Sequence, residues 1–571
     1  MEKTINQGMI NQGKKILLVM FPYWEILIPP MGLSCLKSFL QKHGYSVKTV
    51  DVNVENQFKG VSDRYFKRFS GFVPEEKRGN FYNLGKDVLR QHLMAYINRN
   101  DDASYIELVK AIIYSIFFCQ VTSEQVHELD TDIREFFDLL KTYFLDLLEK
   151  EKPGVLGISL FRGTIPASIF AARLAKEKYP NILTVVGGGS FADELCYGST
   201  NLDFFIEKTK NDIDKIIIGE GELLFLKLLQ GELKENQKVY TINDIGRETL
   251  DLATASIPDF SDFELKDYPS LGSYTSRSCP FECSFCSETL QWGRFRKKKM
   301  DQAVDEMLEL SRKYNRQLFL MSDSLLNPVV NDLSAELLKR DASIYWDGYF
   351  RVDHISSDLE KTFLWRRAGF YRARLGVESG SQRILDLMDK RITVEQIKAA
   401  VSSLAHAGIK TTTYWLIGHP GETDADFQLT LDIIEELKDD IYEAWANIFW
   451  YYPYGQVKSG ELRQKSKLLF PGNSRDLLLL ETRIIDGEPT REEMYSRMFR
   501  FLDHCKKIGV PNLYSLHDFH EADERWKRLH KNAAPSLVSL MDRNSFIDEN
   551  KKLKQVNFAK NTLHENMDFS F

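Results

Sequence analysis

Residues 278–288 read SCPFECSFCSE and form the most distinctive stretch of the chain. It carries three thiols, Cys279, Cys283 and Cys286, in a C-x3-C-x2-C spacing. Three thiolates from one tight loop can hold three corners of a cubic [4Fe–4S] cluster, which ordinarily takes four cysteine ligands. The next cysteine along the chain is Cys505, so the spacing predicts a cluster with one iron left open for a small chelating ligand. An open position on a metal site indicates chemistry rather than a structural role.

Two other roles for these thiols fit the sequence less well than a cluster does. Structural zinc prefers four nitrogen or sulfur ligands, and this loop offers no nearby histidine. Disulfide bonding fits poorly, because the seven cysteines are an odd number and the first residues do not resemble a secretory signal. A cluster assembled in the reducing cytoplasm is therefore the favoured hypothesis.

The composition is typical of a soluble globular protein, with 43% hydrophobic and 27% charged residues among 571. The net charge of −7 argues against a surface that binds nucleic acid. The one basic run, RFRKKK at 294–299, is short and reads as a solvated edge. No apolar run reaches the length of a membrane span, so we expect neither nucleic acid nor membrane as a partner.

The first part of the chain, 1–231, predicts a Rossmann-like (flavodoxin-like) α/β domain. Strands that alternate with helices are typical of a parallel sheet. The strand-like runs are residues 15–20, 45–50, 154–160 and 183–186. Residues 56–150 interrupt this pattern and read as an inserted helical layer. Residues 232–270, with two prolines and few apolar runs, read as a linker.

From residue 271 a β-α pattern repeats six times, which predicts a partial (β/α)6 barrel of the TIM type over 271–456. The predicted strands are residues 272–275, 317–321, 344–350, 371–376, 411–417 and 444–449. In barrels of this type the chemistry lies at the carboxyl ends of the strands, where this chain places polar residues and glycines. Residues 457–571 read as a mainly helical C-terminal region.

The cysteine stretch, with Phe285 before its last thiol, resembles that of the radical S-adenosylmethionine (SAM) enzymes. Two later segments, LGVESGS at 375–381 and GHPGET at 418–423, resemble the cobalamin-dependent group of that family. The resemblance implies that the open iron chelates the amino and carboxylate groups of SAM. It further implies that the reduced cluster cleaves SAM to a 5′-deoxyadenosyl radical, with electrons from an external donor such as flavodoxin or ferredoxin.

The same resemblance implies roles for residues at the strand ends. Glu378 would hold the ribose hydroxyls of SAM, because a carboxylate only accepts hydrogen bonds and suits a diol. Arg351 would pair with the SAM carboxylate through its planar fork, and a surface ion pair is the alternative. The other expected SAM contacts are Ser322 and Asp323, beside the amino group, and Gly418 and Gly421, beside the adenine.

The first domain resembles cobalamin-binding domains. Ser159, at a strand end, is followed by Gly187-Gly188, where glycines let the backbone approach the nucleotide tail closely. Gly219 and Glu220 belong to a further segment of the same resemblance. The chain departs from the family in two ways, because Ser159-Leu160-Phe161 lacks the SxL form and the loop at 21–32 has no histidine to bind cobalt. The resemblance therefore implies cobalamin without a histidine ligand, and a flavodoxin-like domain that lost its cofactor is the alternative.

Together these resemblances imply a cytoplasmic methyltransferase that acts on an unactivated carbon of a small-molecule or peptide substrate. Radical rearrangement, epimerisation or oxidation, with or without cobalamin, is the second hypothesis. A cobalamin- or cluster-sensing regulator is the third, and the lack of a DNA-binding pattern disfavours it. The aromatic run WYYPYG at 450–455 is expected either to line a substrate pocket or to cap the barrel bottom.

Overall fold

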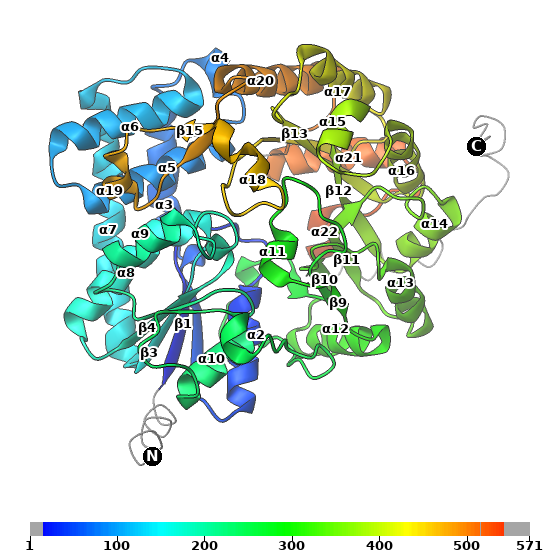
Figure 1. Ribbon diagram of the computed structural model, residues 1–571. Helices are drawn as coiled ribbons and strands as arrows, with labels where there is room; N and C mark the ends of the chain where they lie inside the picture. The colour runs from blue at the N-terminus through cyan, green and yellow to red at the C-terminus, as the bar shows by residue number, and fades with distance from the viewer. Residues whose placement is uncertain (1–14, 514–515, 542–571) are drawn as a thin grey trace.

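The computed structural model describes residues 15–513 and 516–541, which form two parallel α/β units side by side (Figure 1). One unit contains the N-terminal sheet and the other the barrel sheet, and helices surround both. This arrangement confirms the predicted fold class. Within the described residues, no helix combines the length and apolar character needed to cross a membrane.

The first sheet has the order β2-β1-β3-β4-β5-β6, and every neighbouring pair is parallel. Its strands are β1 (Ile16–Met20), β2 (Val47–Asp51), β3 (Val155–Ser159), β4 (Leu183–Gly187), β5 (Lys215–Ile217) and β6 (Val239–Tyr240). The inner strand β1 reads ILLVM and is buried throughout, as expected for a parallel strand covered on both faces. Strand β6 lies in the segment predicted as a linker, so the first unit extends beyond residue 231. The two residues of β6 are too few to give a periodic signal in the sequence.

Helices cover the two faces of this sheet. On one face lie α2 (Met31–Lys42) and α10 (Gly221–Gln230). On the other lie α8 (Ile165–Lys178) and the expected helical layer between 56 and 150. The helices of this layer are α3 (Asn56–Ser70), α4 (Glu75–Arg78), α5 (Phe81–Asn98), α6 (Asp102–Phe117) and α7 (Ser123–Glu151). A capping box at Thr122 starts α7.

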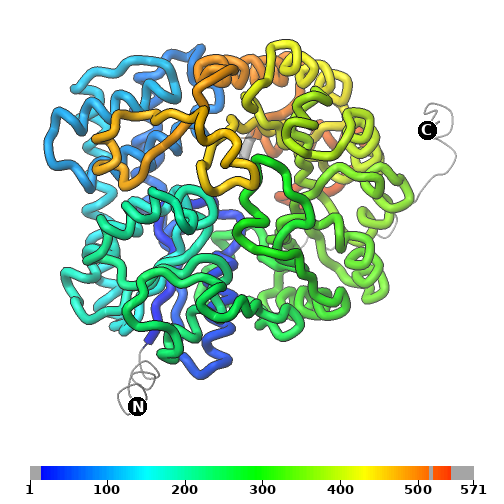
Figure 2. Tube along the Cα trace, viewed as in Figure 1, coloured from blue at the N-terminus to red at the C-terminus, as the bar shows by residue number. Residues whose placement is uncertain are grey.

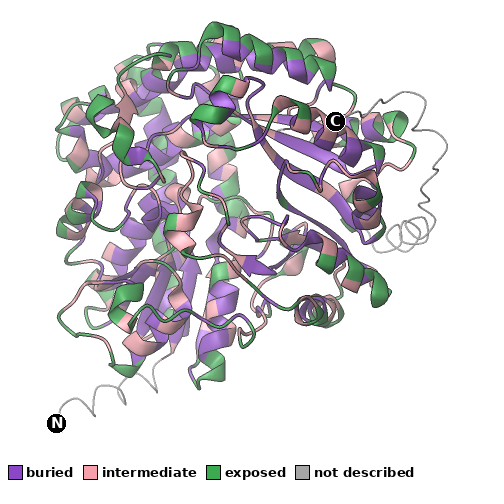
Figure 3. Cartoon of the chain, turned by 45° about the vertical axis from the view of Figure 1, so that its right-hand side comes forward, coloured by how far each residue is buried: buried purple, intermediate pink, exposed green. Residues whose placement is uncertain are grey.

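The second sheet has the order β14-β13-β12-β11-β10-β7 and is also parallel throughout. Its strands are β7 (Leu271–Ser273), β10 (Leu318–Met321), β11 (Tyr345–Arg351), β12 (Phe370–Glu378), β13 (Lys410–Ile417) and β14 (Glu443–Ile448). Its helices are α12 (Met300–Tyr314), α13 (Val330–Lys339), α14 (Leu359–Arg367), α15 (Gln382–Leu387), α16 (Val394–His406) and α17 (Asp424–Glu436). Figure 3 shows these strands largely buried and the exposed residues gathered on the outer sides of the helices. The six-stranded partial barrel is therefore as predicted.

The C-terminal region is mainly helical, as expected, and also contains a small antiparallel hairpin. Its elements are α18 (Ser459–Leu462), β15 (Ser466–Leu468), α19 (Ser474–Leu478), β16 (Arg483–Ile485), α20 (Arg491–Ile508), α21 (Leu516–Leu529) and α22 (Leu537–Met541). The yellow-to-orange segment around this hairpin runs back over the light-blue helical layer (Figure 2). There Asn98 donates a hydrogen bond to the carbonyl of Leu477 at 3.0 Å. The C-terminal region thus joins the two units.

The bottom of the barrel, at the amino ends of its strands, is closed by α21. Lys410, at the start of β13, donates to Asp523 at 2.5 Å, and both side chains are buried. Tyr442, just before β14, donates to the same carboxylate at 2.8 Å. Helix α21 thereby covers the amino ends of these strands.

Candidate functional site

The cysteine loop follows β7 and lies between two short antiparallel strands, β8 (Ser276–Arg277) and β9 (Arg296–Lys297). Backbone hydrogen bonds fix it on two sides. Ser284 donates to the carbonyl of Met388 at 2.9 Å, at the end of α15. The carbonyl of Cys286 accepts from Val457 at 3.1 Å, beyond the last barrel strand. The loop is therefore held by chain segments from both sides of the barrel mouth.

The three thiols share this loop, with Cys283 buried and the other two half-buried. Burial, together with the nearby Glu288 carboxylate and the other two sulfurs, raises the pKa of the Cys286 thiol to about 12. In the part of the chain that the structure describes, no three His, Cys, Asp or Glu side chains are already arranged as ligands of one metal ion. Iron would have to displace the thiol protons, as it does at any thiolate site. As a donor set, three cysteines of one loop fit three irons of a [4Fe–4S] cluster.

Arg351, the last residue of β11, points at the cysteine loop. Its Nη1 donates to Cys283 Sγ at 3.4 Å, and its guanidinium carbon lies 4.0 Å from the centre of the Phe281 ring. Its Nη2 is buried without a hydrogen-bond partner. An unpaired buried donor is costly, so this nitrogen marks a place where an acceptor fits. The alternative of a surface ion pair is wrong, because Arg351 is only 5% exposed.

Glu378 ends β12 at a bulge, where the pairing with β13 shifts after Gly376. Its backbone is left-handed, with φ 66°, and such irregularities re-aim a side chain. Lys390 donates to Glu378 Oε1 at 2.7 Å, and the same amine lies 5.8 Å from the ring centre of Phe285. Glu378 therefore lies beside the cysteine loop. Its contact with the SAM ribose stays a prediction.

Ser322 and Asp323 follow β10 and differ in their surroundings. Asp323 is 1% exposed and accepts from the Thr275 backbone at 3.0 Å, from Thr275 Oγ1 at 2.6 Å and from Ser276 Oγ at 2.5 Å. Burial raises its pKa. Asp323 thus holds the chain that leads into the cysteine loop, whereas Ser322 is exposed. Contact of either residue with SAM stays a prediction.

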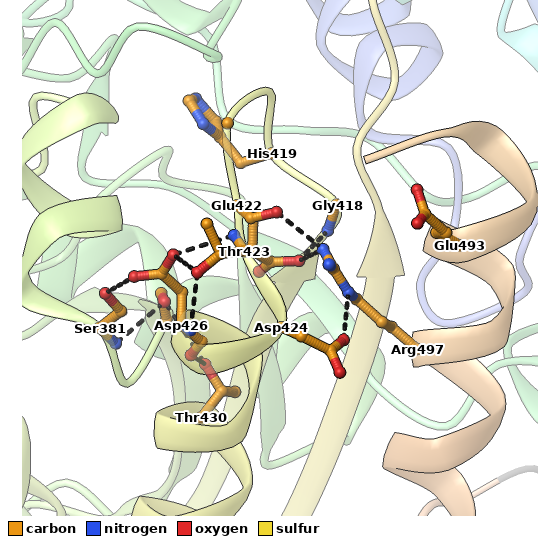
Figure 4. A network of polar contacts seen from close by, with 12 residues as sticks. Ser381, Gly418, His419, Glu422, Thr423, Asp424, Asp426, Thr430, Glu493 and Arg497 are labelled. Carbon is orange, nitrogen blue, oxygen red and sulfur yellow. Dashed lines mark hydrogen bonds and ion pairs between the residues drawn. The ribbon is translucent and has the colours of Figure 1, made fainter. Parts of the chain in front are cut away.

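The turn GHPGET at 418–423 is fastened to helix α20 (Figure 4). Gly418 has φ 81°, and a Cβ there would lie 2.4 Å from the Met494 side chain. The Gly418 amide donates to Glu422 Oε2 at 3.0 Å, and Arg497 of α20 donates to the same oxygen at 3.0 Å. Burial raises the pKa of Glu422 to about 7, although Arg497 opposes the shift. Gly421, with φ 86°, donates its amide to the carbonyl of Glu488 at 2.9 Å. Whether this turn meets adenine stays a prediction.

A cavity of about 660 Å³ lies between the two sheets and has walls from both. The predicted site residues that line it are Ser159, Gly187, Gly188, Gly219, Ser322 and Asp323. The predicted site residues outside its lining are the three cysteines, Arg351, Glu378, Gly418, Gly421 and Glu220. The structure therefore joins the glycine loops of the first unit to one strand end of the barrel. The remaining barrel residues gather around the cysteine loop or the turn at 418–423.

The glycine loops leave bare backbone at the cavity wall. Gly188 has φ 118°, and a Cβ there would lie 2.6 Å from the carbonyl oxygen of Leu160, so only glycine fits. In the loop after β1, Trp24 stacks on Phe161 with ring centres 4.3 Å apart, and both rings line the cavity. This bare backbone beside stacked aromatic rings fits a large planar cofactor such as cobalamin. The loop after β1 has no histidine, and its Trp24 ring lines the cavity.

Glu220 is occupied elsewhere. Its carboxylate pairs with Arg277 at 3.2 Å and also contacts Arg296. Arg277 pairs as well with Glu222 at 2.5 Å. These residues form a charged junction between the two units, which sequence reasoning missed. The one sequence signal for this junction is the position of Arg277, just before the cysteine loop.

The aromatic run at 450–455 packs on the first unit. The Arg162 guanidinium carbon lies 4.1 Å from the centre of the Trp450 ring, and its Nη1 donates to the Tyr452 hydroxyl at 3.3 Å. The run lines a second cavity, of about 270 Å³, together with Asp193. The prediction that it caps the barrel bottom is wrong, because it follows the carboxyl end of β14. The run therefore lies at the barrel mouth, between the two units.

Comparisons with known proteins agree with this geometry. Residues 273–434 match the model of the radical SAM superfamily. The anaerobic magnesium-protoporphyrin IX monomethyl ester cyclase of Rubrivivax gelatinosus is 28% identical over 349 residues, covering 56% of this chain and 60% of the cyclase. An uncharacterized methyltransferase of Pyrococcus horikoshii, PH0819, is 27% identical over 364 residues, covering 59% of this chain and 75% of the relative. The chain thus spans less than two thirds of the cyclase.

One solved structure resembles the chain over nearly its whole length. The radical SAM methyltransferase TsrM from Kitasatospora setae, with tryptophan substrate and a SAM analogue bound, superposes with a TM-score of 0.58 at 14% identity. The match covers 95% of this chain and 98% of TsrM. The family match assigns residues 273–434 to a radical SAM domain, and the fold shared with TsrM extends to the first unit and the C-terminal region.

Proposed function

We propose that the protein is a cobalamin-dependent radical SAM enzyme that methylates an unactivated carbon of a small molecule or peptide. One observation carries this proposal: the cavity of about 660 Å³ that joins the glycine loops of the first unit to the carboxyl end of β10, close to the cysteine loop. The methyltransferase relative supports methyl transfer. A solved structure of TsrM with cobalamin and a [4Fe–4S] cluster bound supports the cofactor set.

The residues of this chain would bind SAM and exclude water. When bound, the cluster supplies an electron for SAM cleavage and cobalamin supplies the methyl group. Arg351 would offer its unpartnered Nη2 to the SAM carboxylate, as a planar fork suits that partner. Glu378, held by Lys390 at 2.7 Å, would accept hydrogen bonds from the ribose. The two sheets would shield the reacting atoms from water.

Electrons would come from an external donor such as flavodoxin or ferredoxin. A cytoplasmic location belongs to the same proposal, and its support is that all seven cysteines are free thiols, as in a reducing compartment. A second candidate is a radical reaction without methyl transfer. The observation that favours it is the cyclase among the relatives.

The test begins with anaerobic reconstitution of the full chain with iron and sulfide. About four irons per chain are expected. Cys279→Ala should lose them, whereas Cys119→Ala, buried in the helical layer away from the loop, should keep them. A full cluster in Cys279→Ala would show that the ligand assignment is wrong.

The reaction class is tested with SAM, reductant and cobalamin. Retained cobalamin together with S-adenosylhomocysteine supports methyl transfer. Formation of 5′-deoxyadenosine by a protein that never retains cobalamin would refute it and favour the second candidate.

A further inference from the structure

The inner face of the barrel sheet is open to solvent near the carboxyl ends of its strands. Along β11 every residue is buried except Tyr349, which is 47% exposed. In β13 the residues that escape full burial are Tyr414 and Leu416, and in β14 they are Trp445 and Asn447. These residues alternate along their strands, so within each strand they share one face. Because helices cover the outer face, that face lines the barrel interior.

Three of these side chains form a continuous aromatic row across the sheet. The ring centres of Tyr349 and Tyr414 are 6.1 Å apart, and those of Tyr414 and Trp445 are 6.5 Å apart. Strand β12 lies between β11 and β13, and its residue paired with Tyr414 is Gly376. Gly376 has no side chain to separate the rings. A Cβ there would lie 2.7 Å from Glu378 Oε1, so the row reaches the carboxylate proposed to hold SAM.

Below the row a charged layer closes the barrel. Asp347 is 1% exposed, and its Oδ2 accepts from Arg372 at 2.8 Å and from Arg374 at 2.9 Å. Arg374 is the β12 partner of Tyr349 in the sheet register, and its guanidinium carbon lies 5.9 Å from the centre of the Tyr349 ring. A ligand on the row would therefore rest on this ion-paired layer. Above the row, Tyr349 also lines the cavity of about 660 Å³ between the two units.

We infer that the row of Tyr349, Tyr414 and Trp445 is the substrate seat and that it takes a planar aromatic ring. The inference rests on the proposed function, because the row lies beside Glu378, the carboxylate that the proposed function assigns to SAM. Aromatic side chains bind flat rings through offset or edge-to-face contacts, which add to the burial of apolar area. The three rings present no unpaired charge, so they favour an uncharged ring over an ionic group.

The test measures binding of two matched probes to the full chain reconstituted with its cluster. One probe is N-acetyl-phenylalaninamide and the other is its cyclohexylalanine analogue, which has a puckered ring of similar size. Isothermal titration calorimetry should give tighter binding of the phenyl probe, by between about twofold and tenfold. Free phenylalanine distinguishes a free amino acid from a residue within a peptide, and tight binding of either aromatic form supports the inference.

Variants locate the binding. Tyr349→Leu and Tyr414→Leu should each weaken phenyl binding by about tenfold and abolish the preference over cyclohexyl. Tyr197→Leu is the control, because Tyr197 lies in the first unit and is 64% exposed. This variant should bind both probes as the parent does. The inference is overturned if the parent binds the two probes equally, or if neither probe binds at millimolar concentration. It is also overturned if both Leu variants keep the preference of the parent for the phenyl probe.

Failure of the inference and failure of the proposed function can be told apart. SAM binding and reductive formation of 5′-deoxyadenosine are measured on the same preparations. If SAM is cleaved but aromatic probes show no preference, only the inference fails. If SAM is neither bound nor cleaved, the proposed function fails and the inference fails with it.

Discussion

Replacing Arg497 with methionine should loosen the turn at 418–423. In the parent, Arg497 and Glu422 are both buried, and their side chains meet at 3.0 Å. Removing one partner of a buried pair leaves the other charge without compensation, which typically costs about 3–5 kcal/mol. The variant Arg497→Met should therefore open this turn more readily than the parent.

The stability that the turn loses in this variant depends on pH, because Glu422 titrates. Its pKa in the folded protein is about 7, above its ordinary value of 4.5. The folded state therefore holds a proton that the unfolded chain has released, and stability falls as pH rises between these values, by about 3 kcal/mol in all. Without Arg497 the pKa rises further. Above pH 7 the free energy of turn opening in the variant should then fall, relative to the parent, by up to about 1.4 kcal/mol for each pH unit. This fall should continue until the pH reaches the pKa of Glu422 in the variant.

Hydrogen exchange of the peptide spanning 416–427 measures this opening. At about pH 6, where Glu422 is largely protonated with or without Arg497, the variant should lose about 2 kcal/mol of protection, the worth of its hydrogen bonds. At about pH 9 the loss should reach about 3–5 kcal/mol. The control is Arg500→Met, because Arg500 is 44% exposed and pairs with the exposed Asp424 at 3.0 Å, a contact worth at most about 1 kcal/mol. Equal effects of the two variants, or a loss independent of pH, would refute the reasoning.

Three further substitutions test the cavity walls and the junction. Gly188→Ala should weaken cobalamin retention by about tenfold or more, because its Cβ would meet a carbonyl at 2.6 Å, whereas Gly198→Ala has open space; absorbance of the bound cofactor measures both. Lys390→Met should weaken SAM binding by about tenfold in calorimetry at unchanged iron content, because it frees the carboxylate at the end of β12. Gly455→Ala should shift the cluster's electron paramagnetic resonance spectrum and lower cobalamin retention together, since its Cβ would meet the backbone of the first unit at 2.5 Å. Gly460→Ala, with nothing within 4 Å, should change neither.

The parts of the fold that the sequence predicts are those with continuous apolar runs. Parallel strands covered on both faces leave such runs, and all six predicted barrel strands overlap the observed ones. Short edge elements escape this reasoning. Strand β6 has two residues, and the hairpin strands β15 and β16 have three each, so neither alternation nor length distinguishes them from loop.

The candidate site is predictable where one segment carries it and obscure where distant segments meet. The three thiols lie within eight residues, so their shared loop follows from spacing alone. Glu220 was expected to meet a cofactor, but it pairs with Arg277, which lies 57 residues further on. Arg497 reaches Glu422 across 75 residues. The sequence around Glu220 or Glu422 does not predict either arginine partner, because these ion pairs depend on how distant segments pack.

The segment after β14 explains how two units can share one cavity. Within a few residues it contacts both halves of the site. The Val457 amide donates to the carbonyl of Cys286 at 3.1 Å, and Gly455 packs so closely on Asp193 that a Cβ would lie 2.5 Å from its Cα. Between these contacts the chain is too short to absorb a shift of one unit against the other. The cysteine loop and the glycine loops are therefore held at a fixed separation, which a reaction that uses groups from both sides of the cavity requires.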